Sequence, residues 1–91
     1  TQGVSSAASD VYKRQRLTFT NLRNALQAAG GTLAHVTQVL IYMTDVADMP
    51  TIDAVYREFF EAPYPNRSSM GISALVVPGM KLEIVAYAML P

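Results

Sequence analysis

The chain has 91 residues, a formal net charge of zero, no cysteine and 51% hydrophobic residues. This length bounds it to one small domain, and the lack of cysteine excludes a disulfide scaffold and thiolate metal sites. The neutral charge, without a basic run, argues against a nucleic-acid surface, and no apolar run is long enough to cross a bilayer.

The apolar content is high for so short a chain without a membrane span. We therefore expect part of the apolar surface to be buried between subunits. A sequence without cysteine fits a reducing compartment, which predicts a cytoplasmic protein. Asp45, Asp48 and Asp53 lack the spacing of a metal-binding loop, and there is no phosphate-binding glycine loop. Neither a metal nor a cofactor is expected.

Residues 1–15 differ in character from the rest of the chain. They are rich in serine and alanine and show no amphipathic period, which predicts a flexible tail. Residues 5–15 agree, residue for residue, with one reading frame of a widely used transposase sequencing adapter. A natural linker with the same sequence is the alternative. We predict that residues 1–15 are a non-native tail and that residues 16–91 form the biological domain.

The first helix is predicted over residues 17–29. Its buried stripe recurs at helical spacing and consists of Phe19, Leu22, Leu26 and Ala29. Gly30 and Gly31 end the helix because glycine readily adopts the left-handed conformation of a helix C-cap.

Residues 36–44 are predicted to form the first strand, and both of its faces are apolar. Val39, Ile41 and Met43 alternate with Leu40 and Tyr42. A strand that is apolar on both sides needs a cover on each side. Two helices can cover one face of the sheet. The other face must then meet another chain or a missing part of this one.

A second helix is expected to begin at Asp48, with Pro50 in its first turn. Its buried stripe comprises Met49, Ile52, Val55, Tyr56, Phe59 and Phe60. Pro63 and Pro65 then keep the chain extended up to Arg67.

Two further strands are predicted within residues 65–90, with a turn at Pro78-Gly79 between them. Arg67 opens the first of these strands, and Glu83 lies inside the second. We expect these strands to pair across that turn and so to bring Arg67 and Glu83 to one end of the sheet. On composition alone, Arg67 is an ordinary residue in a surface salt bridge, and Glu83 is a partner of Lys81 or Arg67.

Several short motifs occur in one order along the chain: Asn-Leu (21–22), Ala-Gly-Gly (29–31), Tyr-Met-Thr-Asp (42–45), Val-Tyr-x-x-Phe-Phe (55–60), Pro-x-Arg-Ser (65–68), Gly-Ile (71–72), Pro-Gly (78–79) and Leu-Glu-Ile (82–84). In this order and spacing the sequence resembles the Rid family, also called RidA/YjgF or L-PSP endoribonuclease. The resemblance runs from Arg16 to Leu90.

The resemblance implies an α+β fold of the chorismate-mutase-like (YjgF-like) type, with two helices on one face of a mixed sheet, assembled as a homotrimer. Family members have strands before the first helix, and this sequence has none there. The resemblance therefore implies an N-terminally truncated domain that lacks a tyrosine and a Ser-Gly pair used at the family's site.

The resemblance also implies an activity. Rid enzymes are enamine/imine deaminases that hydrolyse 2-imino acids, of the 2-aminoacrylate or 2-iminobutanoate type, to 2-keto acids and ammonia without a cofactor. Arg67 matches the family's substrate-binding arginine, whose planar fork suits a carboxylate. Backbone groups at Ser69 would position the imine nitrogen, and Glu83 would hold and deprotonate the attacking water.

Other functions stay open. The chain is alternatively a non-catalytic Rid-like binding or chaperone-type module, or an inactive fragment. A ribonuclease is a weaker alternative, because the chain is neutral and has a single histidine, His35, rather than a pair for acid–base work. Ser68 and Ser69 lack the histidine and aspartate partners of a nucleophilic serine.

Overall fold

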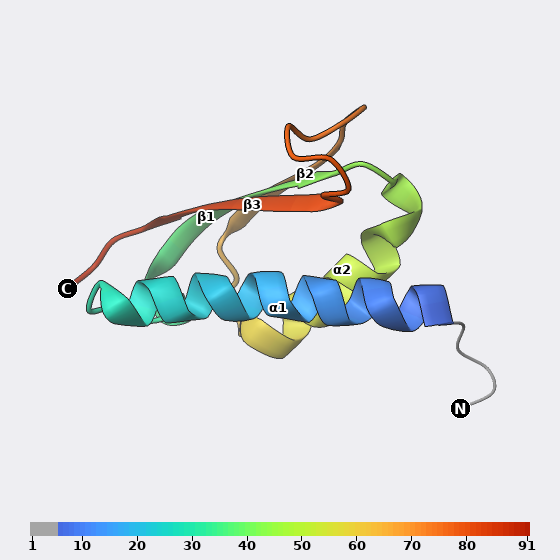
Figure 1. The fold of residues 1–91 in the computed structure, drawn as a ribbon. Helices are drawn as coiled ribbons and strands as arrows, with labels where there is room; N and C mark the ends of the chain where they lie inside the picture. The colour runs from blue at the N-terminus through green and yellow to red at the C-terminus, as the bar shows by residue number, and fades with distance from the viewer. Residues whose placement is uncertain (1–5) are drawn as a thin grey trace.

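The computed structural model describes the backbone of residues 6–91 and the side chains of residues 10–91. The elements in chain order are helix α1 (Ser6–Ala28), a 3-10 turn (Leu33–His35), strand β1 (Val36–Met43), a second 3-10 turn (Val46–Asp48), helix α2 (Met49–Phe59), strand β2 (Asn66–Gly71) and strand β3 (Leu82–Ala88). Both helices lie on one face of the three-stranded sheet (Figure 1). This arrangement confirms the predicted α+β class.

Strand β1 lies at the centre of the sheet, in the order β2-β1-β3. It pairs in parallel with β2 and antiparallel with β3, so the sheet is mixed. The predicted pairing of β2 with β3 is wrong. A strand that is apolar on both faces is best buried at the centre, where both of its edges are also paired. Residues 72–81 lead the chain past the end of β1 (Figure 1).

The two predicted glycine turns are present. Gly79 has φ 81°, and Met80 N–H donates to the Val77 carbonyl at 3.1 Å, which closes the turn at Pro78-Gly79. Gly30 has φ 88°, and Gly31 N–H donates to the Leu26 carbonyl at 2.8 Å, which ends α1. The turn at Gly79 thus forms as predicted, but it lies within a longer connection rather than in a hairpin.

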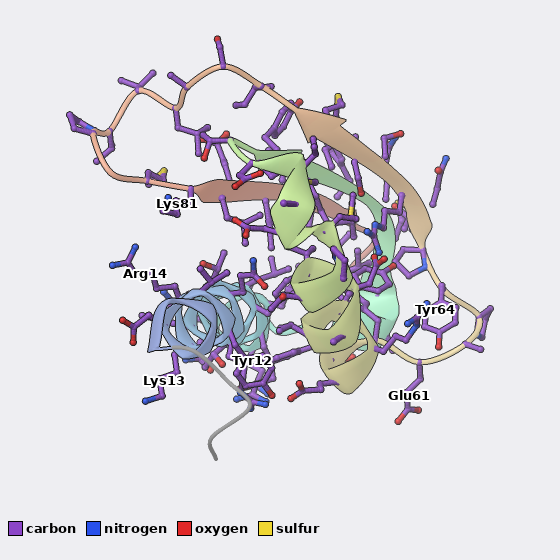
Figure 2. All side chains as sticks on the ribbon, turned by 90° about the vertical axis from the view of Figure 1, so that its right-hand side faces the viewer. Tyr12, Lys13, Arg14, Glu61, Tyr64 and Lys81 are labelled. Carbon is purple, nitrogen blue, oxygen red and sulfur yellow. The ribbon has the colours of Figure 1, made fainter. Side chains whose placement is uncertain are left out.

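The start of α1 differs from the prediction, because the helix begins at Ser6 rather than near residue 17. Tyr12, labelled in Figure 2, donates a hydrogen bond to Glu58 of α2 at 2.5 Å. Arg16 forms an ion pair with the same carboxylate, and Gln15 is buried. The contacts of Tyr12 and Arg16 with α2 depend on tertiary structure and leave no period in residues 1–15. The prediction of a flexible tail is therefore wrong for residues 10–15, which belong to α1 and contact α2 through Tyr12, whereas residues 1–5 lie outside the described part. The non-native origin of residues 1–15 stays a prediction.

The core lies between the sheet and the helices. Val39, Ile41 and Met43 face the helices and are almost fully buried, as predicted from their alternation. Phe19 of α1 is fully buried against an aromatic cluster on α2, with ring centroids 6.3 Å from Tyr56 and 5.6 Å from Phe59. This cluster joins the two helices to each other. No helix in the described range 6–91 is long and apolar enough to span a membrane.

Because Phe19 joins the helices, we expect Phe19→Ala to destabilise the fold by about 3–5 kcal/mol, a large part of the total stability of a small domain. Leu17→Ala is the matched control, because Leu17 lies on the same helix and is 60% exposed. Urea unfolding followed by circular dichroism measures both. Equal stability losses in the two variants would contradict the placement of the core.

Candidate functional site

Arg67 lies on the helix-facing side of the sheet. It is the second residue of β2 and pairs in register with Val39, whose side chain is buried beneath the helices. Its guanidinium donates from Nε to Ser69 Oγ at 2.9 Å and from Nη2 to Asp53 Oδ1 at 2.5 Å. The side chain is only 21% exposed. Arg67 is thus a partly buried cation held by an ion pair.

Two further groups enclose the same guanidinium. Nη2 lies 3.3 Å from Met49 Sδ, and Cζ lies 4.7 Å from the centroid of the Tyr56 ring, within the range of a cation–π interaction. A guanidinium with an aromatic face on one side and a carboxylate beside it has little freedom to change its rotamer.

The local sequence explains why these groups meet. Residues two apart on a strand share a face, so Arg67 and Ser69 both point to the helices. Residues four and three apart on a helix also share a face, which places Met49, Asp53 and Tyr56 in one row on α2. The alternation and the helical row are visible in the sequence. The docking of one against the other depends on the parallel pairing of β2 with β1.

Tyr56 contributes an unusual hydroxyl to this site. The residue is buried, and within the described residues its hydroxyl has no hydrogen-bond partner. Burial raises the pKa of Tyr56, although the positive charge of Arg67 opposes that rise. The phenol therefore stays neutral at physiological pH, and its ring rather than its hydroxyl contacts Arg67.

Glu83 lies on the side of the sheet opposite to Arg67. It pairs in register with Tyr42 of β1, is exposed, and occupies the sheet face that the helices leave uncovered. Two strand spacings, roughly 10 Å, separate β3 from β2. The expectation that strand pairing brings Arg67 and Glu83 to one end of the sheet is wrong within a single chain. The structure brings Arg67 and Ser69 together and leaves Glu83 apart.

Asp53 is the site residue that sequence reasoning missed. From the sequence we considered Asp53 only as a metal ligand and excluded that role, but its carboxylate turns to Arg67 on β2. The sequence does contain a signal for this position, because Asp53 follows Met49 by four residues and precedes Tyr56 by three, and both of these residues belong to the predicted buried stripe of the helix. Arg67 does form a salt bridge, as the interpretation from composition held, but its partner is Asp53, which that interpretation did not name.

The sheet face opposite the helices is apolar. The side chains on this face come from alternate residues of β1 and β3 and include Leu40, Tyr42, Val85 and Tyr87. Tyr87 is 54% exposed, and Met89, just beyond β3, is 74% exposed. In the described part of the chain nothing covers this face, which agrees with the expectation that the two helices cover one side only.

Two surface grooves lie outside these groups. One, of about 370 Å³, lies between α1 and residues 78–82 and is flanked by Arg14 and Lys81 (Figure 2). The other, of about 240 Å³, adjoins Phe60 and Pro63. Arg67 and Glu83 line neither groove. Among the described residues there is no group of three acidic or histidine side chains that could hold a metal ion.

Comparison with known proteins gives concordant matches. The model of a family described as Endoribonuclease L-PSP matches residues 2–90, so the match begins earlier than the resemblance recognised from residue 16. The "Putative reactive intermediate deaminase TdcF" of Escherichia coli (strain K12) is 35% identical over 83 residues, which are 88% of this chain and 64% of that protein.

Two further matches agree. The 2-iminobutanoate/2-iminopropanoate deaminase of Bos taurus is 30% identical over 78 residues, covering 86% of this chain and 56% of that protein. The crystal structure of E. coli TdcF with bound serine superposes with a TM-score of 0.79 at 34% identity, covering 86% of this chain and 63% of that one. The chain spans less than two thirds of the length of each of these three proteins.

The unpartnered hydroxyl of Tyr56 generates a test. We expect Tyr56→Phe to keep the ring contacts and to leave stability at about pH 7 unchanged or raised, because an unsatisfied buried hydroxyl is removed. Because the pKa of Tyr56 is higher in the folded chain than its unfolded value of about 10, wild type keeps its full stability below about pH 10 and loses part of it as the pH rises through the folded pKa. Tyr56→Phe should therefore lose less stability than wild type above about pH 10.

Urea unfolding at both pH values measures this difference, with Tyr64→Phe as the control because Tyr64 is exposed. A marked loss of stability in Tyr56→Phe at neutral pH would show that the hydroxyl does make a stabilising hydrogen bond.

Proposed function

The chain belongs to the endoribonuclease L-PSP family, which includes the Rid deaminases, and from this premise we propose that it is an enamine/imine deaminase. Its substrates are 2-imino acids of the 2-aminoacrylate or 2-iminobutanoate type, which it hydrolyses to 2-keto acids and ammonia. The observation that carries the proposal is the held guanidinium of Arg67 at the Pro-x-Arg-Ser position. A fixed, partly buried arginine is suited to orient a small carboxylate.

The reaction needs little more than orientation and proton transfer. Water adds to the imine carbon, the carbinolamine loses ammonia, and a carbonyl remains, so that imine and water give keto acid and ammonia. Arg67 holds the carboxylate, groups at Ser69 position the imine nitrogen, and Glu83 accepts a proton from the attacking water. No metal or cofactor is required by this scheme.

Assembly decides whether Glu83 can take part. Because the sheet separates Arg67 from Glu83 in one chain, we infer that the Glu83 acting beside a given Arg67 comes from a neighbouring subunit. The uncovered apolar face, with Leu40, Val85 and Tyr87, supports self-association. We propose a cytoplasmic homotrimer with its sites in the clefts between subunits, acting on a small molecule rather than on nucleic acid or a membrane.

A non-catalytic Rid-like binding module is the second candidate. It predicts ligand binding by Arg67 without any acceleration of imine hydrolysis. A ribonuclease predicts cleavage of single-stranded RNA, which the neutral charge disfavours. Assays of 2-iminobutanoate hydrolysis and of RNA cleavage, with one protein preparation, separate the three functions.

We expect Arg67→Lys to lower kcat/KM for 2-iminobutanoate by about a hundredfold or more, because lysine keeps the charge but loses the planar fork. The matched control is Arg57→Lys, since Arg57 is an exposed arginine of α2 outside the site. Steady-state production of 2-oxobutanoate measures both variants. An Arg67→Lys enzyme as efficient as wild type would remove Arg67 from the site.

We expect Glu83→Gln to lower kcat with little change in KM, because glutamine keeps the shape and loses the base. Mixing Arg67→Lys subunits with Glu83→Gln subunits, after dissociation and reassembly, should restore activity well above that of either variant alone. Restoration occurs because some clefts then combine an intact Arg67 with an intact Glu83 from different chains. A mixture no more active than its components would contradict a site shared between subunits.

A further inference from the structure

Arg67 and Asp53 place opposite charges side by side at a partly open position. The Nη2 atom of Arg67 lies 2.5 Å from Oδ1 of Asp53, and the two side chains are 21% and 34% exposed. A site built only to hold an anion would be expected to present a cation without a neighbouring carboxylate, because that carboxylate repels the anion. The pairing therefore suggests a ligand that carries both charges.

Each member of the pair keeps hydrogen-bonding capacity. In the part of the chain that the structure describes, Arg67 uses Nε and Nη2, and Asp53 uses Oδ1. The Nη1 hydrogens of Arg67 and the second carboxylate oxygen of Asp53 have no partner among those residues. The ion pair can thus accept a carboxylate at one end and a cationic nitrogen at the other while it stays intact.

The chemistry of a 2-imino acid fits this arrangement. Its carboxylate and its nitrogen are borne by adjacent carbons, and its protonated form is an iminium zwitterion with the two charges a few ångströms apart. The iminium form is also the more electrophilic one, so a carboxylate beside the nitrogen favours the reactive species.

We propose that Asp53 binds the protonated nitrogen of the substrate while Arg67 binds its carboxylate, which makes Asp53 a specificity-determining residue for zwitterionic 2-imino and 2-amino acids. This inference rests on the proposed function of Arg67 and adds the nitrogen-binding group. The 2-keto acid product has lost the cationic nitrogen, so it leaves the second carboxylate oxygen of Asp53 without a partner and is released more readily than the substrate. Serine, found in the E. coli TdcF structure, is a zwitterion of this kind.

Two stable probes of equal carbon number test the proposal. L-2-aminobutanoate carries the carboxylate and a cationic nitrogen, whereas 2-oxobutanoate carries the carboxylate alone. Isothermal titration calorimetry of the full chain should show that wild type binds L-2-aminobutanoate about tenfold more tightly than 2-oxobutanoate, the value of one charge-assisted hydrogen bond. Asp53→Asn keeps the size and one acceptor oxygen but removes the charge. This substitution should weaken the binding of L-2-aminobutanoate by about tenfold, and the binding of 2-oxobutanoate should stay equal or become tighter.

The control is Glu61→Gln, which removes an exposed carboxylate in the loop after α2 and should change neither affinity. Circular dichroism of each variant reports folding. If Asp53→Asn does not fold, the wild-type preference between the two probes still decides, because equal wild-type affinities overturn the proposal.

The remaining outcomes are distinct. If Asp53→Asn weakens the binding of both probes alike, Asp53 only positions Arg67. If it tightens the binding of both probes alike, Asp53 only competes with the ligand's carboxylate for Arg67. Either result overturns the proposal. Arg67→Lys separates these failures from a failure of the proposed function: it should weaken both probes, and unchanged affinities for both would remove Arg67 from the site altogether.

Discussion

The pairing of β1 along both edges is the constraint on which the rest of the structure depends. Its register with β2 sets which side of the sheet Arg67 faces, and its register with β3 sets which side Glu83 faces. A shift of one residue in either ladder would move the charged side chain to the opposite face. The buried row of Val39, Ile41 and Met43 holds that register, because a shifted strand would expose this row and bury polar groups.

The partly buried charge of Arg67 follows from the same constraint. A cation turned toward the helices must be paired, since an isolated buried charge is costly. Asp53 supplies the counter-charge, the Tyr56 ring supplies a face, and Ser69 supplies an acceptor. All three positions are fixed by periodicities of α2 and β2 that also build the core. The site is therefore a polar extension of the helix–sheet interface, and its geometry depends on the packing of α2.

Local patterns in the sequence predicted much of this fold. The strand at 36–44, the helix that begins near Asp48 and the turn at Gly79 follow from alternation, helical spacing and glycine chemistry, and each is present. The order of strands was not predictable in the same way, because the choice between a hairpin and a crossover is made by non-local pairing. Adjacency in sequence suggested that β2 and β3 pair, whereas the two-sided apolar character of β1 was the better guide to the sheet's centre.

Two further differences between the prediction and the structure also arise from contacts between residues far apart in the sequence. The extension of α1 back to Ser6 is supported by contacts of Tyr12 and Arg16 with Glu58, which lies more than forty residues away. Asp53 joined the site through a strand that packs on α2 only in the folded chain. Arg67 itself was identified through resemblance to a family, and the structure adds the partners that hold it.

The central claim, that Arg67 holds the carboxylate of a small substrate, is tested most directly by nuclear magnetic resonance of [15N]arginine-labelled protein. The Nε–H resonance of Arg67 is assigned from its loss in Arg67→Lys, and L-2-aminobutanoate is then titrated. We expect a saturable shift of the Arg67 resonance, with the resonances of the exposed Arg14 and Arg57 unmoved. A saturable shift at another arginine, or no shift at Arg67 at ligand concentrations that saturate binding, would contradict it.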